Sequence, residues 1–155
     1  AARDLRDATR DLLPAHGAFD TQRRPCGTPL SAPHAYALVT LLHGAPMTIS
    51  ALAERLSIDR TNVSRLCARM EAAGEVVREP DPSDLRARQI RLTPHGAQAG
   101  KGIDTLSVAH FERVRVALAG RSAEVVDALM LLARAMESTQ ATQTTQTTQP
   151  PEPTR

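Results

Sequence analysis

The sequence predicts a mostly α-helical protein that carries one small β-hairpin. Apolar residues recur at helical spacing through most of the 155-residue chain, so that each segment has one apolar face. Aromatic residues make up only 2% of the chain, and packed helices can build a core from Ala, Leu, Val and Met instead. A Pro/Asp/Ser turn between two short β-like runs predicts the hairpin.

Two helices are expected in the first part of the chain, with a loop between them. Residues 3–13 predict a short charged helix with its leucines on one side. The segment RRPCGTP is rich in Arg, Pro and Gly and predicts the loop. Ser31 is expected to cap the second helix, because Pro33 then falls in its first turn, and Gly44 marks its end.

A pair of helices follows, with a very short turn between its members. Apolar positions predict one helix over residues 48–56 and a second helix that ends at Gly74. Ser57, Ile58 and Asp59 form the turn, with Asp59 as the N-cap of the second helix. Such a pair is a helix-turn-helix. The inward positions of its second helix are Val63, Leu66, Cys67 and Met70.

The predicted hairpin comes directly after this pair. Its two runs are residues 75–78 and 88–92. Thr93-Pro94 then starts a helix in the usual order of a cap followed by proline. The seam of that helix comprises Ile103, Leu106, His110, Val114 and Ala117.

A final helix and a tail are expected at the end of the chain. Gly120 stops the preceding helix, and Ser122 is expected to cap the final one. Residues 138–155 have almost nothing to bury, and their Thr/Gln repeats end in Pro, which predicts a disordered tail. The inward positions of the final helix are Val125, Leu129, Leu132 and Met136.

Composition and charge exclude several classes of protein. The net charge is only +2, so non-specific nucleic-acid binding does not follow from the total charge. The 2 cysteines form no C-x-x-C pair, which fits a reducing cytosol, and no apolar run is long enough for a membrane span. Because catalytic constellations, metal-ligand strings and Gly-rich phosphate loops are missing, we expect neither an enzyme nor a cofactor.

The outward face of the second helix of the pair carries groups that suit duplex DNA. Arg pairs bidentately with guanine, Asn pairs with adenine, and hydroxyl groups reach bases or phosphates. The N-terminal half of such a helix enters the major groove. The candidate DNA contacts on this helix are Arg60, Thr61, Asn62, Ser64, Arg65 and Arg69.

The hairpin adds further candidate DNA contacts. Asp84 and Arg86 are two residues apart, which places them on one face of a hairpin strand, where the carboxylate can orient the guanidinium. An Arg at such a tip reaches the narrow, electronegative minor groove. Arg88 is a further candidate at the start of the second run.

The helix pair and hairpin together resemble the MarR/SlyA family of winged-helix transcriptional regulators, over residues 3–136. The specific string is D-P-x-D-x-R-(x)5-L-T-x-x-G, matched by Asp81, Pro82, Asp84, Arg86, Leu92, Thr93 and Gly96. The preceding L-x-x-x-G-x-V-x-R-like segment is matched by Met70, Gly74, Val76 and Arg78. Three positions depart from the family pattern, namely Leu85 for Arg or Gln, His34 for Gln, and Ser57 for a turn Gly.

The resemblance implies a winged helix-turn-helix flanked by N- and C-terminal dimerisation helices. Residues 31–93 would form the winged helix-turn-helix, and residues 1–20 and 94–137 the dimerisation helices, within a single domain over residues 1–137. A homodimer would bind an inverted-repeat operator in double-stranded DNA. In that complex Arg86 would be the minor-groove Arg and Asp84 its partner. The expected protein is a bacterial, cytoplasmic repressor.

The resemblance also implies a sensed signal. Family regulators commonly bind a small aromatic or lipophilic effector, and His34 and Tyr36 are the candidate pocket residues. A first alternative is a thiol-based redox-sensing regulator that uses Cys26, since neighbouring Arg side chains favour a thiolate. A second alternative is a winged-helix protein–protein interaction module. The spacing of the His and Cys residues does not reproduce the family's zinc sites, so no metal is assigned.

Overall fold

The computed structural model describes residues 1–16, 28–84 and 86–147. The chain divides into two compact units, residues 1–110 and 111–155. The division falls inside one continuous helix, α5 (Pro94–Ala117). The interpretation of residues 1–137 as a single domain therefore stays a prediction.

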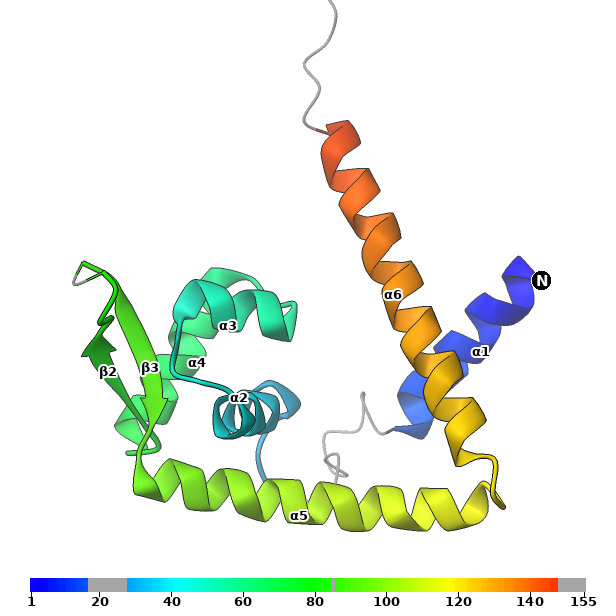
Figure 1. The fold of residues 1–155 in the computed structure, drawn as a ribbon, viewed down its shortest axis with the longest axis horizontal. Helices are drawn as coiled ribbons and strands as arrows, with labels where there is room; N and C mark the ends of the chain where they lie inside the picture. The colour runs from blue at the N-terminus through cyan, green and yellow to red at the C-terminus, as the bar shows by residue number, and fades with distance from the viewer. Residues whose placement is uncertain (17–27, 85, 148–155) are drawn as a thin grey trace, which may run out of the picture. The chain divides into compact units, whose positions relative to one another are not determined.

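The middle of the first unit is a winged helix-turn-helix, as the sequence predicted. It consists of three helices followed by a hairpin: α2 (Ala32–His43), α3 (Ile49–Leu56), α4 (Arg60–Ala72), β2 (Val76–Pro80) and β3 (Arg88–Leu92). Figure 1 shows the hairpin beside the three helices, with the start of α5 directly after β3.

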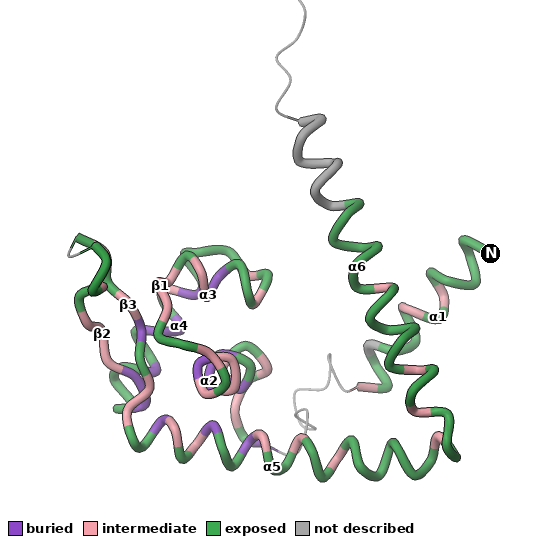
Figure 2. Tube along the Cα trace, viewed as in Figure 1, coloured by how far each residue is buried: buried purple, intermediate pink, exposed green. Residues whose placement is uncertain are grey.

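The core of the described residues lies in this helix-and-hairpin lobe. Leu38, Leu52, Met70 and Ile90 are among its largest fully buried side chains, and they come from α2, α3, α4 and β3 respectively. In Figure 2 the buried positions follow these elements and the first half of α5, where Ile103 is buried. The inward stripe predicted for α4 is confirmed, because Val63, Leu66, Cys67 and Met70 are all buried.

The turn between α3 and α4 is fixed by backbone geometry and two caps. Ser57 adopts the left-handed conformation (φ 52°, ψ 40°), and its amide and that of Ile58 donate to carbonyls of the last turn of α3. Thr48 Oγ1 caps α3 by accepting from the Ala51 amide at 3.2 Å. Asp59 caps α4 as predicted. The two helix axes are therefore set by local hydrogen bonds as well as by the shared core.

The sheet contains one strand that the sequence analysis missed. β1 (Met47–Thr48) pairs antiparallel with β3, so the order is β1-β3-β2, with Met47 opposite Ile90. A two-residue strand is too short to show alternation of apolar and polar residues. β2 and β3 pair in the register Arg78 to Ile90 and Pro80 to Arg88, which extends β2 two residues beyond the predicted run.

A tight junction joins the hairpin to α5. Thr93 Oγ1 accepts from the Gly96 amide at 3.0 Å, which confirms the predicted start of the helix, and donates to the Gly74 carbonyl at 2.6 Å. A Cβ atom at Gly96 would lie 1.9 Å from the Glu75 carbonyl oxygen. Only glycine therefore allows the first turn of α5 to lie this close to the Glu75 backbone, directly before β2.

The outer helices differ from the predictions at several points. α1 (Ala2–Ala15) matches the first predicted helix, but α6 (Ser122–Thr147) begins with Ser122 inside it, so this residue is not the cap. Helix α6 extends to Thr147, into the segment from Ser138 for which a disordered tail is expected, and the tail itself stays a prediction. Ser138 and Thr139 are helical, and their hydroxyls donate to backbone carbonyls three residues earlier. These local bonds pair the hydroxyl groups although the residues are exposed. Residues 148–155 lie outside the described residues.

Among the described residues, the apolar stripe of α6 is left largely exposed. Leu129 and Met136 are 45% and 46% exposed, and Val125 and Leu132 are half-buried. On the predicted seam of α5, Ile103 is buried whereas Leu106 is 47% exposed. None of the described helices is both long and apolar enough to cross a lipid bilayer.

Candidate nucleic-acid interface

The outward face of α4 is free of covering elements in the described part of the chain. Its candidate contacts Arg60, Thr61, Asn62, Arg65 and Arg69 are exposed, and Ser64 is half-buried. This face is exposed because the opposite stripe, which includes Val63 and Leu66, packs into the core. The helix therefore presents guanidinium, amide and hydroxyl groups to solvent on a rigid, buried base.

The first turn of α4 holds one of these side chains in a defined orientation. Asp59 Oδ1 accepts from the Asn62 backbone amide at 2.9 Å, and Asp59 Oδ2 accepts from Asn62 Nδ2. The first of these bonds, to the backbone, is the main cause that lowers the pKa of the Asp59 carboxyl. The carboxylate thus binds both the backbone and the side chain of Asn62.

The hairpin tip is arranged differently from the sequence-based expectation. Asp84 and Arg86 lie in the turn between β2 and β3, and both are exposed. Asp84 Oδ1 accepts from the Arg86 backbone amide at 3.0 Å, not from its guanidinium. The two residues occupy a turn and not one face of a strand, so Asp84 holds the Arg86 backbone here, and its role as partner of the guanidinium stays a prediction. Leu85 lies outside the described residues.

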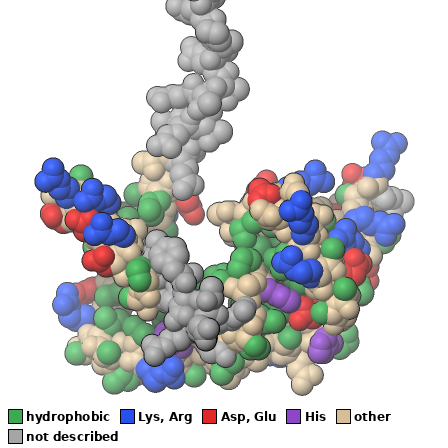
Figure 3. Space-filling model, turned by 180° about the vertical axis from the view of Figure 1, so that it is seen from behind, with side chains coloured by type: hydrophobic (Ala, Val, Ile, Leu, Met, Phe, Trp, Pro, Cys, Tyr) green, Lys and Arg blue, Asp and Glu red, His purple; other side chains and the backbone are tan. Residues whose placement is uncertain are grey.

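The arginines of the lobe fall into two groups. The first group is paired with glutamates. Arg91 forms a bidentate ion pair with Glu79 across the hairpin, with Arg91 Nε 2.9 Å from Glu79 Oε2. Arg78 Nε lies 3.1 Å from Glu71 Oε2. Among the described residues, no ion pair involves the arginines at positions 60, 65, 69, 86 and 88. Figure 3 shows basic side chains on the outer surface of this lobe, including the hairpin tip at the upper right. Unpaired guanidinium groups remain available for an anionic partner.

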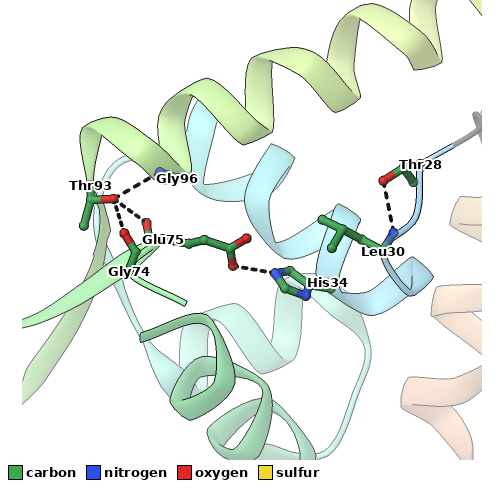
Figure 4. A network of polar contacts seen from close by, with 7 residues as sticks. All are labelled: Thr28, Leu30, His34, Gly74, Glu75, Thr93 and Gly96. Atoms are coloured by element: carbon green, nitrogen blue, oxygen red, sulfur yellow. Dashed lines mark hydrogen bonds and ion pairs between the residues drawn. The ribbon is translucent and has the colours of Figure 1, made fainter. Parts of the chain in front are cut away.

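His34 was a predicted pocket residue, but its ring is engaged inside the lobe. His34 Nε2 lies 2.6 Å from Glu75 Oε2, and the side chains are only 16% and 9% exposed. Figure 4 shows the ring on α2 pointing toward the Glu75 carboxylate, while the Glu75 carbonyl accepts from Thr93. His34 therefore joins α2 to the start of the hairpin.

Tyr36, the second predicted pocket residue, lines an open hollow between α2 and α3. The ring is 53% exposed, and Tyr36 Oη lies 3.5 Å from His16 Nε2. The hollow has an apolar floor with a single guanidinium at its edge, and its lining residues are Ala32, Pro33, Tyr36, Thr40, Arg55, Leu56 and Ile58.

The described residues show neither a reactive cysteine nor a metal site. Cys26 lies outside them. Cys67 is fully buried, and this burial raises the pKa of its thiol. Within residues 1–16, 28–84 and 86–147, no group of three His, Cys, Asp or Glu side chains is placed to hold a metal ion.

Sequence reasoning missed the polar partners that hold these side chains. Glu75 looked like the first residue of a strand, and its buried carboxylate is visible only when α2 is placed beside it. The Asp59–Asn62 contact had a local signal, since the D-x-x-N spacing puts an acceptor at the N-cap and an amide at the third helical position. Arg55, at the edge of the hollow, carried no such signal.

Comparison with known proteins places the lobe in a described family. Residues 28–87 match the model of the MarR family. One curated relative is the uncharacterised HTH-type transcriptional regulator YkoM of Bacillus subtilis (strain 168). The two chains are 29% identical over 103 residues, and the aligned region covers 66% of this chain and 65% of YkoM. The chain spans between 41% and 65% of the length of the curated relatives it matches.

Solved structures show the same architecture. The MarR family transcriptional regulator AbsC of Streptomyces coelicolor aligns with a TM-score of 0.61 and 27% identity, covering 70% of this chain and 76% of that chain. The PcaV transcriptional regulator of the same organism, in complex with its natural ligand, aligns with a TM-score of 0.59 and 21% identity, covering 88% of this chain and 89% of that chain. At that identity the second likeness concerns the fold alone.

Proposed function

Because the chain belongs to the MarR family of winged-helix transcriptional regulators, we propose that it binds duplex DNA in a sequence-specific manner. Helix α4 enters the major groove and the hairpin follows the adjacent minor groove. The observation that carries this proposal is the exposed polar face of α4, formed by Arg, Asn and hydroxyl side chains over a fully buried apolar stripe.

The distribution of ion pairs supports the same surface. Arg78 pairs with Glu71 of α4, and Arg91 pairs with Glu79 of the hairpin. Arg86 and Arg88 have no such partner among the described residues. Arg86 sits in the turn, where a guanidinium reaches the narrow minor groove, and Arg88 starts the returning strand. With a total net charge of only +2, binding depends on this local set of arginines and not on bulk charge.

The active form is a homodimer that binds an inverted repeat. The chain leaves large apolar side chains exposed on α5 and α6, including Leu106, Val114 and Leu129. Exposed apolar side chains of this kind favour contact with another protein surface, and a second copy offers the same helices. Two α4 helices related by twofold symmetry would read two half-sites about one helical turn, roughly 10 base pairs, apart.

A small aromatic or lipophilic effector modulates DNA affinity from the hollow that contains Tyr36. Its apolar floor and the Arg55 guanidinium suit a ring that carries an acidic group. The fold neighbour PcaV is described with a bound natural ligand. Tyr36→Ala should abolish the response to such compounds while DNA binding without them persists. The regulator acts as a repressor, so deletion of its gene should raise expression from the promoter it occupies.

The experiment that tests DNA binding is a gel shift followed by footprinting on the DNA upstream of the protein's own gene. A retarded band at low salt and two protected half-sites about one helical turn apart are expected. Unrelated DNA of the same length serves as the competitor. If no upstream fragment is retarded even at low salt, the lobe is a protein–protein interaction module instead.

A further inference from the structure

We propose that Asp59 is a positioning residue that orients the Asn62 amide for reading one base pair, an inference that rests on the proposed DNA-binding function. Asp59 is the N-cap of α4, and Asn62 lies three residues later in the first turn. One carboxylate oxygen accepts from the Asn62 backbone amide at 2.9 Å, and the other accepts from Asn62 Nδ2. A helix cap requires only the first of these bonds.

The second bond determines which way the amide faces. A carboxylate has no hydrogen to donate, so it can hold Nδ2 but not Oδ1 of Asn62. The bond therefore selects one of the two amide orientations. It leaves Oδ1 as an acceptor and the second N–H of Nδ2 as a donor. One acceptor beside one donor is the pattern that pairs with N6 and N7 of adenine in the major groove.

The surroundings of Asn62 agree with a reading role. Asn62 is exposed and shares a hollow with Pro33, Arg65 and Arg69, so two guanidinium groups that suit phosphates flank the oriented amide. The Asp59 carboxylate itself is exposed and repels phosphates. A serine would cap α4 without that repulsion, but it lacks the second oxygen that holds Asn62 Nδ2.

The test is the variant Asp59→Ser, measured on the wild-type operator fragment and on each of its single-base-pair substitutions. Serine keeps the cap but lacks the oxygen that holds Nδ2. Discrimination at one base pair in each half-site should fall about 2- to 12-fold, which corresponds to releasing one immobilised side chain. Affinity for unrelated DNA should stay equal or rise, because a negative charge has been removed.

Two further variants separate orientation from helix stability. Asn62→Ala should lose discrimination at the same base pair, and adding Asp59→Ser to it should change nothing more, because Asp59 acts through Asn62. Asp59→Asn, which also caps well, lets the two amides pair in either orientation and should broaden the preference at that base pair. Circular dichroism confirms that each variant is folded.

The outcomes are distinct. If the wild type binds DNA and Asp59→Ser and Asp59→Asn both keep its full base preference, the inference is overturned and DNA binding stands. If the double variant loses discrimination beyond Asn62→Ala, Asp59 does not act through Asn62, and the inference is overturned too. If the wild type binds no DNA, the proposed function and the inference fail together.

Discussion

His34 Nε2 lies 2.6 Å from Glu75 Oε2, although the two residues are 41 positions apart in the chain. The pair links the first turn of α2 to the start of the hairpin. The Glu75 carbonyl also accepts a hydrogen bond from Thr93, the residue directly before α5. One largely buried polar contact therefore connects the three elements that set the position of the hairpin relative to the helices.

Loss of the Glu75 carboxylate should destabilise the lobe. Glu75→Ala leaves the His34 ring without its acceptor in a site that is only 16% exposed, so the free energy of unfolding should fall by about 1–3 kcal/mol. Urea denaturation measures this loss. His34→Gln, which keeps a donor toward Glu75, should cost less than about 1 kcal/mol. Equal losses in the two variants would contradict the role of the hydrogen bond.

Gly96 should tolerate no side chain. Gly96→Ala places a Cβ atom 1.9 Å from the Glu75 carbonyl oxygen, and both groups belong to the backbone junction, so the loss should exceed about 3 kcal/mol. Gly102→Ala is the matched control on the same helix, because nothing lies within 4 Å of its added Cβ. That variant should gain about 0.5–1 kcal/mol from helix propensity. Thermal melts of both variants check the contrast.

The two kinds of arginine on the hairpin should behave differently toward DNA. Arg86→Ala removes an unpaired guanidinium at the turn and should weaken operator binding by about 1–3 kcal/mol with the fold intact. Arg91→Ala, whose guanidinium is already held by Glu79, should weaken it less. Fluorescence anisotropy with the footprinted fragment measures both. An unchanged affinity in Arg86→Ala would remove the hairpin tip from the mechanism.

A charge on the α5 seam should break the proposed dimer. Leu106 is 47% exposed in the single chain, and Leu106→Glu would bury a lone carboxylate at an apolar contact between two copies. Sedimentation velocity should show a monomer. Thr105→Glu puts the same charge on a different face of the helix and should leave the dimer intact. A Leu106→Glu protein that still sediments as a dimer would contradict the assignment of this seam.

The Cys67 thiol should be unreactive in the folded protein. Its burial raises the pKa of the thiol above the usual value of 9.0, so it stays protonated at neutral pH. In a Cys26→Ser variant, a thiol-reactive dye should therefore react only after denaturant is added. A raised pKa in the folded state also means that stability is lost as the pH rises above about 9.0, since the unfolded thiol ionises first. Fast labelling of the native variant at neutral pH would show that this part of the core opens.

The sequence alone determined the order and type of the main elements, because their signals are local. Helical spacing of apolar residues, the cap at Asp59, the Thr93-Pro94 start and the turn of the hairpin act over a few neighbours and predicted α2 to α5. The same local periodicity predicted which side of α4 is buried, and so which side chains are left for DNA. The Thr/Gln segment shows a limit of reasoning from composition. It has few side chains that could be buried, yet α6 continues through it as far as Thr147.

Tertiary structure decided which polar groups meet. Three contacts join segments separated by tens of residues: the His34–Glu75 pair, the pairing of β1 with β3, and the approach of Gly96 to Glu75. The periodicity within one segment does not predict which other segment it contacts. The orientation of Asp84 toward the Arg86 backbone depended on the conformation of the turn, which spacing alone does not fix. Local hydrogen bonding and apolar spacing fix the elements, and three-dimensional packing selects their polar partners.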